Sequence, residues 1–198
     1  MRNVTISHIK HSTILKKENT IGCCGIDCGL CPRFHTNGKS ACPGCCGKDF
    51  KDKHPSCGVV TCCVTKRGLE TCADCKDFPC DRLTTESAGY DSFVTHRKMF
   101  PNLEYIKTNG TTLFVNQQHI RIEILTDFLN QYDDGRSKSF YCLTCALLPI
   151  DKLKDCRRYI DSIEGLVDIK EKCRTLKEKI LQIANELQIE IKLNKHYG

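Results

Sequence analysis

The sequence predicts an α+β protein that is mostly helical, with a loop-rich N-terminal module packed on a helical C-terminal domain. Composition changes near Leu83: thirteen of the 17 cysteines lie in residues 23–80, together with many glycines and prolines. Beyond that point apolar residues recur at three- and four-residue steps, as in amphipathic helices. The predicted parts are an N-terminal extension at 1–20, a cysteine-rich module at 21–83 and a helical domain at 84–198.

The cysteine-rich module cannot be stabilised by a hydrophobic core alone. It holds few large apolar side chains, and its glycines and prolines keep regular secondary structure short. Burial of so little apolar surface does not offset the chain entropy lost on folding. The module therefore needs cross-links, which cysteine can supply as disulfides or as metal ligands.

The expected cellular compartment favours metal ligation over disulfide bonds as the cross-link. Residues 1–20 carry scattered basic side chains and lack the continuous apolar stretch of a secretory signal. No stretch approaches the ~18–20 apolar residues that span a bilayer, so we expect no membrane partner and a cytoplasmic location, where thiols stay reduced. The odd total of 17 cysteines, with adjacent pairs at 23/24, 45/46 and 62/63, also suits thiolate ligation better than a full set of disulfides.

Three C-x-x-C pairs, at 28/31, 42/45 and 72/75, supply the centre of the predicted metal site. A two-residue spacer lets a tight turn direct both sulfurs at one ion. The predicted ligands are Cys24, Cys28, Cys31, Cys42, Cys45, Cys57, Cys62, Cys72, Cys75 and Cys80. Ten sulfurs exceed the eight that two tetrahedral sites require, so some are redundant or a third centre exists; Cys23, Cys46, Cys63 and His54 are alternative ligands.

Zinc is the predicted metal, as two ions, because four-thiolate sites built from C-x-x-C pairs usually hold it. An iron–sulfur cluster is the alternative. Cys24, Cys28 and Cys31 have the C-x-x-x-C-x-x-C spacing that resembles the cluster site of radical S-adenosylmethionine enzymes, although the chain lacks the strand–helix alternation of a barrel. A four-cysteine cluster with Cys80 as the fourth ligand is also open.

The ordered motifs also resemble a known family. The run from Cys24 to Pro32, the Cys42–Cys45 pair, Cys57 with Cys62, and the run from Cys72 to Leu83 with its Phe-Pro-Cys ending are similar to a cysteine-rich prokaryotic domain of unknown function, DUF3795. The likeness covers about residues 23–83, and the segment 135–142 resembles a motif of longer members. The resemblance implies metal binding without an established activity.

The second half predicts helices at 90–99, 111–131 and 139–148. A further helix is expected to start at a cap on Asp151 and to bury Leu153, Cys156, Ile160 and Ile163. A longer one is expected to bury Ile169, Cys173, Leu176, Ile180, Ile183 and Leu187. Alternating apolar residues at 187–193 predict a short strand.

Two smaller features lie near the start of the helix predicted at 139–148, one just before it and one within it. Arg136, Ser137 and Lys138 offer cations and a hydroxyl that could bind an anion or an anionic cofactor group, with a solvated loop as the alternative. Cys142 and Cys145 form a fourth C-x-x-C, which would be a redox pair, a metal contact or two core residues.

Charge and motif order constrain function only loosely. The net charge of +6 would fall to about +2 if two zinc ions were each held by four thiolates, so nucleic-acid binding is not strongly supported. No catalytic set can be recognised from residue order, and whether the chain is an enzyme stays open. The favoured hypothesis is a zinc-stabilised cytosolic binding or adaptor protein with a protein partner; the alternative is an iron–sulfur redox or sulfur-handling protein of anaerobic metabolism.

Overall fold

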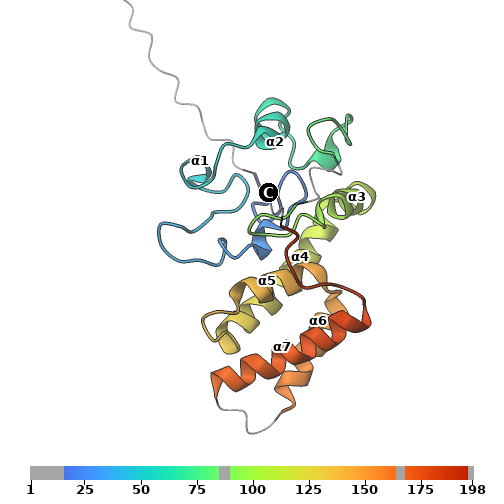
Figure 1. Cartoon of the computed structure of the whole chain (residues 1–198). Coiled ribbons are helices and arrows are strands. Elements are labelled where there is room, and N and C mark those ends of the chain that lie inside the picture. Colours follow the sequence, from blue (N-terminus) through green and yellow to red (C-terminus); the bar gives the residue numbers. More distant parts are fainter. Residues whose placement is uncertain (1–15, 85–89, 164–167, 196–198) are drawn as a thin grey trace, which may run out of the picture.

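The computed structural model describes residues 16–84, 90–163 and 168–195, and over these ranges the chain is mostly helical (Figure 1). Strand pairing in the described ranges is limited to an isolated antiparallel bridge between Cys80 and Leu83. The mostly helical prediction is confirmed. The predicted extension at 1–20 lies outside the described residues except for 16–20.

The cysteine-rich segment folds as short turns of helix joined by loops. Its elements are a 3-10 turn η1 (Cys28–Leu30), α1 (Phe50–Lys53), α2 (Gly58–Val60) continued by a π-helical turn η2 (Thr61–Lys66), and a second 3-10 turn η3 (Cys72–Asp74). Longer helices are disfavoured because glycines and prolines recur throughout this stretch.

Five longer helices follow: α3 (Met99–Asn109), α4 (Thr111–Gln131), α5 (Lys138–Leu147), α6 (Ile150–Asp161) and α7 (Ile169–Glu186). The bounds of α4 match the prediction, and those of α5 differ from it by one residue. In α6 and α7 the predicted inward residues Leu153, Cys156 and Ile160, and Cys173, Leu176, Ile180 and Ile183, are buried. Ile169 and Leu187 are instead exposed, and Ile163 lies beyond the end of α6 and is only partly buried. Asp151 lies inside the first turn of α6.

The helix predicted at 90–99 is wrong. Residues 90–98 form a loop, and α3 starts at Met99 with Pro101 in its first turn, where a missing N–H costs nothing. The Asp91 carboxylate accepts hydrogen bonds from the backbone N–H of His96 (2.6 Å) and from Thr95 Oγ1 (3.2 Å). A short acidic side chain that binds nearby backbone in this way competes with helix formation.

The strand predicted at 187–193 is also absent. After α7 the chain returns to the cysteine-rich half (Figure 1), and Arg97 donates to the carbonyls of Glu190 (2.9 Å) and Lys192 (2.6 Å). Asp91 N–H donates to the Asn194 carbonyl at 2.8 Å. The tail is therefore held by an arginine side chain and the loop at 90–98, since no neighbouring strand is available to pair with it.

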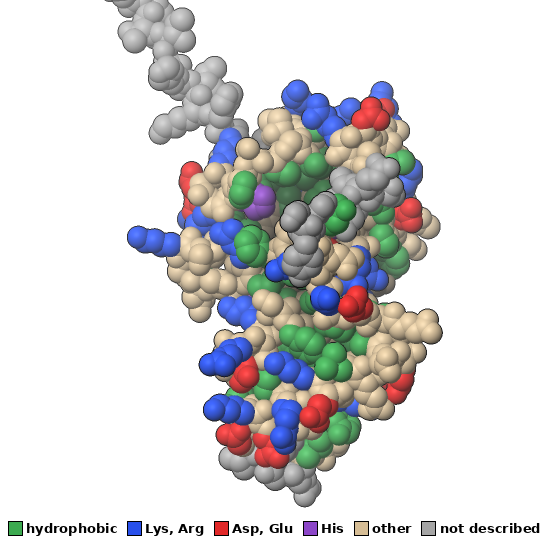
Figure 2. Space-filling model, viewed as in Figure 1, with side chains coloured by type: hydrophobic (Ala, Val, Ile, Leu, Met, Phe, Trp, Pro, Cys, Tyr) green, Lys and Arg blue, Asp and Glu red, His purple; other side chains and the backbone are tan. Residues whose placement is uncertain are grey.

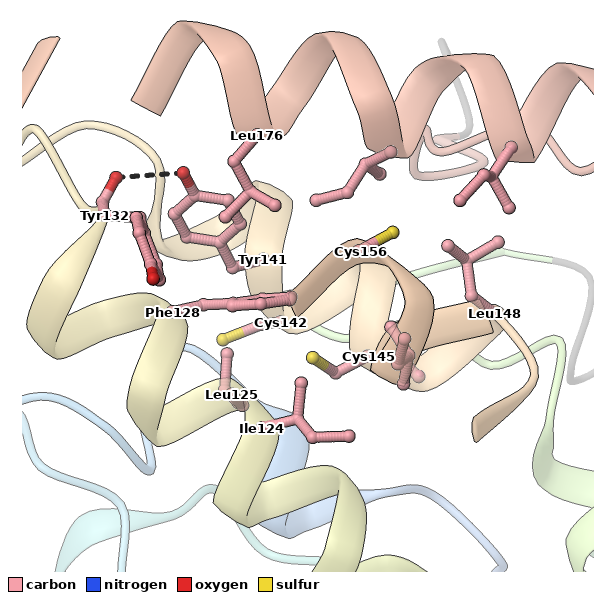
Figure 3. Packing of buried hydrophobic residues seen from close by; sticks show 14 of the residues in the cluster. Ile124, Leu125, Phe128, Tyr132, Tyr141, Cys142, Cys145, Leu148, Cys156 and Leu176 are labelled. Atoms are coloured by element: carbon pink, nitrogen blue, oxygen red, sulfur yellow. Dashed lines mark hydrogen bonds between the residues drawn. The ribbon is translucent and has the colours of Figure 1, made fainter. Parts of the chain in front are cut away.

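Two apolar clusters organise the helices. The larger one lies between α4, α5, α6 and α7, and Figure 3 shows Phe128, Tyr141 and Leu176 meeting inside it. A smaller cluster joins Ile21, Ala73, Phe78 and Leu83 of the cysteine-rich segment to Met99, Leu103, Ile106 and Phe114 of α3 and α4. Helix α4 contacts α3, α5, α6 and the η1 turn, so it touches both clusters. None of the described helices combines the length and the apolar character needed to cross a bilayer.

Candidate metal centre

The ten predicted ligands all line one of two cavities. Cavity A, of about 350 Å³, is lined by Cys24, Cys28, Cys31, Cys42, Cys45 and Cys57. Cavity B, of about 370 Å³, is lined by Cys62, Cys72, Cys75 and Cys80. The fold thus brings the first two C-x-x-C pairs to one cavity and the third to another.

A row of buried sulfurs lies between the cavities. The Cys23 thiol contacts those of Cys45 and Cys63, Cys45 also contacts Cys46, and Cys63 contacts Cys72. The Cys23 N–H also points at Cys45 Sγ, 3.4 Å away. We call Cys46, Cys45, Cys23, Cys63 and Cys72 the sulfur row. Because Cys45 lines cavity A and Cys72 lines cavity B, this row connects the two.

The sulfur row contains all three cysteines that the sequence offered only as alternative ligands, Cys23, Cys46 and Cys63. They are almost completely buried and form a cluster with Cys45 and Val64. The signal for them was the doubling of cysteine at 23/24, 45/46 and 62/63. Both members of the doublets 23/24 and 62/63 line a cavity, and in the doublet 45/46 only Cys45 does.

Two sulfurs of the row are stabilised as thiolates. Hydrogen bonds from Cys23 and Cys46 lower the pKa of Cys45 to about 3, with help from the Lys16 ammonium. Hydrogen bonds from Cys23 and Cys72 lower the pKa of Cys63 to about 4, again with Lys16 nearby. Lys16 is itself buried and donates to the carbonyls of Ile21 (2.9 Å) and Glu70 (2.7 Å). Thiolates are the form of cysteine that binds metal.

Two thiols of the first cysteine loop, Cys24 and Cys28, are held in their neutral form by burial and by neighbouring thiols. Burial raises the pKa of Cys24 to about 12. Burial also raises the pKa of Cys28, and the nearby thiols of Cys45, Cys24, Cys31 and Cys42 raise it further. A divalent cation reverses this balance, because it compensates the charge of closely spaced thiolates.

The donor set fits a soft metal, although its members do not converge on one point. Across the described ranges, no group of three or more His, Cys, Asp or Glu side chains already has the spacing of a metal site. The thiols line the walls of cavities that each exceed the roughly 30 Å³ share of one water molecule several-fold. All 17 cysteines are free, so their sulfurs remain available as ligands.

A buried carboxylate fixes the first cysteine loop on the helices. Asp27, between Cys24 and Cys28, accepts hydrogen bonds from Asn102 Nδ2 of α3 (3.0 Å) and Gln118 Nε2 of α4 (2.6 Å). Burial raises the pKa of Asp27 to about 6 despite these donors. Sequence reasoning missed this role; the available signal was an acidic residue between Ile26 and Cys28 in a segment otherwise free of charge.

Several donors of the predicted anion site are already used. Asp133 and Asp134 accept from the backbone N–H groups of Ser137 (2.9 Å) and Arg136 (3.0 Å), and Ser137 Oγ donates to Asp134 at 2.6 Å. Lys138 Nζ reaches away to the His35 carbonyl at 3.0 Å. Arg136, Ser137 and Lys138 therefore satisfy the loop's own acidic groups and the cysteine-rich segment, which does not favour an external anion.

The fourth C-x-x-C faces the helical core. Cys142 and Cys145 are buried between α4, α5 and α6 (Figure 3). Burial raises the pKa of Cys142 to about 12 and that of Cys145 well above its ordinary value. Both are neutral thiols at physiological pH, so core packing is the reading that the structure favours. Cys156 and Cys173 are buried in the same cluster.

Two histidines line cavity A together with its cysteines. His54, the predicted alternative ligand, is exposed; its ring stacks on Phe50 and its Nδ1 lies 2.8 Å from the Pro55 carbonyl. His96 comes from the loop at 90–98, and sequence reasoning did not connect it with the cysteines. Figure 2 shows a histidine among the hydrophobic side chains of the cysteine-rich half.

Comparison with known proteins gives a family and no activity. Residues 20–85 match a family described as "Protein of unknown function (DUF3795)". No curated protein and no solved structure matches the chain. The match covers the thirteen cysteines around both cavities and confirms the resemblance seen in the sequence. The cysteine-rich segment at residues 20–85, about a third of this chain, is thus similar to the DUF3795 family.

Proposed function

We propose that this protein binds metal through its cysteine-rich segment, and that the metal is zinc, with two ions bound per chain. The observation that carries the proposal is the division of the ten predicted ligands between two cavities, six in one and four in the other. Four thiolates complete a tetrahedral zinc site, so each cavity offers at least one full set. Cavity B would use Cys62, Cys72, Cys75 and Cys80.

Three features of the chain support metal in place of disulfides. The cysteines of the sulfur row each touch further thiols, an arrangement that suits shared thiolate ligands better than separate pairs. Cys45 and Cys63 have strongly lowered pKa values and are ready to ligate. The cluster they belong to contains Val64 as its one fully buried aliphatic side chain, so packing alone supplies little stability there.

We further propose a structural metal and a cytoplasmic binding or adaptor role. A metal that holds the zinc-ribbon-like or knuckle-like shape of a loop-rich segment fits a protein that presents a surface to a protein partner. On the face in Figure 2, Lys and Arg side chains alternate with Asp and Glu over the helical half. Mixed charge of this kind suits a protein partner better than the phosphate backbone of a nucleic acid.

An iron–sulfur cluster in cavity A is the second candidate, and a specific arrangement favours it. Cys24, Cys28 and Cys31 line the same cavity, and its volume of about 350 Å³ has room for a polynuclear centre. When bound, such a cluster would supply one-electron redox chemistry. Cavity A is where this chain could place a redox or sulfur-handling function.

Metal analysis of the full chain separates the two. Protein purified anaerobically from medium without added zinc should be colourless and contain about two zinc ions. A brown protein with iron and acid-labile sulfide would establish the cluster instead. Protein that is free of metal, binds none when offered, and keeps residues 23–83 rigid would overturn metal binding altogether. The variant Cys72→Ser should lose the ion of cavity B alone.

A further inference from the structure

His96 is placed among the cysteines by a loop from the other half of the chain. It lines cavity A together with Cys24, Cys28 and Cys57, although it is separated from Cys24 by more than seventy residues in sequence. It comes from the same loop as Phe93, whose ring lies 5.6 Å from the guanidinium of Arg33, another residue lining the cavity. The loop at 90–98 thus forms one wall of a cavity whose other walls carry several thiols.

The imidazole of His96 has one nitrogen in use and one without a partner. Nε2 lies 3.2 Å from Ser92 Oγ, and Nδ1 is buried without any hydrogen-bond partner. In the tautomer in which Nε2–H donates to the serine, Nδ1 carries a free lone pair. Leaving such a nitrogen buried and unpaired is energetically unfavourable, so it is a position where a ligand is expected.

Other buried polar atoms without partners do not have this setting. Among the described residues, three other side-chain atoms are also buried without a hydrogen-bond partner: Thr20 Oγ1, Gln118 Oε1 and Thr144 Oγ1. None of these three residues lines cavity A or cavity B. A hydroxyl or amide oxygen is also a poor match for the soft metals that thiolates select, whereas an imidazole nitrogen is a good one.

The surrounding contacts hold the backbone at His96 in place. Asp91 accepts from the backbone N–H of His96 at 2.6 Å and is joined to Asn194 of the C-terminal tail at 2.8 Å. Arg97, next in sequence, donates to the tail carbonyls of Glu190 and Lys192. A histidine that ligates a metal usually donates its other N–H to a nearby oxygen, as His96 can to Ser92.

We propose that Nδ1 of His96 is a ligand of the metal in cavity A, beside thiolates of the same cavity. Cavity A is then a mixed thiolate–imidazole site assembled from two distant segments, while cavity B is an all-thiolate site. This inference rests on the proposed metal-binding function and assigns it a ligand outside the DUF3795 match. Metal in cavity A would also order the loop at 90–98 and the tail attached to it.

Cobalt(II) reports both the number and the type of ligands, so it is the probe for the test. The reduced full-length chain is titrated with Co²⁺ and followed by its d–d and sulfur-to-cobalt charge-transfer bands. His96→Ala should lower the affinity of cavity A for Co²⁺ by about 100-fold or more, and Ser92→Ala should lower it by about 10-fold. Ligands and the residues that orient them both contribute to affinity. His96→Cys should restore Co²⁺ binding in cavity A and move the d–d bands to longer wavelength, because a fourth sulfur replaces the nitrogen ligand.

The control is His119→Ala, which removes an exposed histidine on α4 that lines neither cavity. This variant should keep the wild-type spectrum and stoichiometry, and circular dichroism verifies that every variant is folded. An unchanged spectrum and affinity in folded His96→Ala would overturn the histidine ligand while leaving metal binding by the cysteines intact. A wild-type chain that binds no Co²⁺ would instead remove the proposed function, and this inference with it.

Discussion

At the scale of single residues, Asp27 links the first cysteine loop to the helices. Its carboxylate is buried, and it receives one hydrogen bond from α3 and one from α4. Because Asp27 stands between Cys24 and Cys28, these bonds orient the loop that supplies three of the thiols of cavity A. A polar group in this position is a positioning residue for the cysteines.

Asp27→Ala is expected to lower the free energy of unfolding by about 2–4 kcal/mol, because Asn102 and Gln118 lose their acceptor inside the protein. Urea denaturation with the metal content held constant measures the change. The matched control is Asp52→Ala on the exposed face of α1, with an expected change within about 0.5 kcal/mol. Equal effects of the two substitutions would show that the buried bonds contribute nothing.

Gly25, beside Cys24, is required by both its backbone angle and its surroundings. Its φ is +88°, and a Cβ would lie 2.2 Å from the Met99 carbonyl oxygen. Gly25→Ala should therefore destabilise the protein by about 3 kcal/mol, measured as a shift in the denaturation midpoint. Gly38→Ala, with a similar φ of +85° and open space around it, should cost only about 1 kcal/mol. A Gly25→Ala variant no less stable than Gly38→Ala would contradict the close approach.

At the scale of elements, cysteines divide into two groups by where they lie. Those in α5, α6 and α7 are buried among aliphatic and aromatic side chains, while those before Leu83 line cavities or touch other sulfurs. Helical periodicity explains the first group, because an apolar stripe accommodates cysteine as a small hydrophobic residue. The second group follows no such stripe.

Replacing the cysteines of the helical core should therefore leave the metal content unchanged. Cys142→Ala, Cys145→Ala and Cys156→Ala are each expected to cost about 1 kcal/mol of stability through lost packing, with wild-type metal per chain. Cys28→Ser, in cavity A, should reduce the metal content. Elemental analysis of the four purified variants provides the comparison, and a loss of metal in Cys145→Ala would place that residue in the metal centre.

Removal of metal should loosen the elements unequally. The cluster between α4, α5, α6 and α7 contains only Leu30 from the cysteine-rich segment, so these helices keep most of their packing. Helix α3 shares its cluster with Ile21, Phe78 and Leu83 and should lose part of its protection. Hydrogen exchange before and after chelation is expected to show fast exchange at 23–83, intermediate exchange in α3 and slow exchange in α5–α7. Uniform loss of protection would mean that one cooperative unit spans the chain.

At the scale of the whole molecule, the C-terminal tail connects the last helix to the first cavity. It is bound to the loop at 90–98, and that loop lines cavity A (Figure 1). The contact between tail and loop and the contact between loop and cavity could not be predicted from a sequence pattern. Arg97, for example, binds main-chain carbonyls, which every residue carries. The alternation at 187–193 predicted a strand, and the tail lacked a partner strand to form one.

The sequence by itself determined the helices from α4 onward, the crowding of cysteine before Leu83 and the likeness of that segment to DUF3795, since periodicity and spacing are local properties of the chain. Only the tertiary structure decided how the cysteines divide between two cavities, which thiols form the sulfur row, and that Asp27 and His96 stand beside them. The physical reason is distance along the chain. Side chains separated by tens of residues meet through packing and hydrogen bonds that no local pattern encodes.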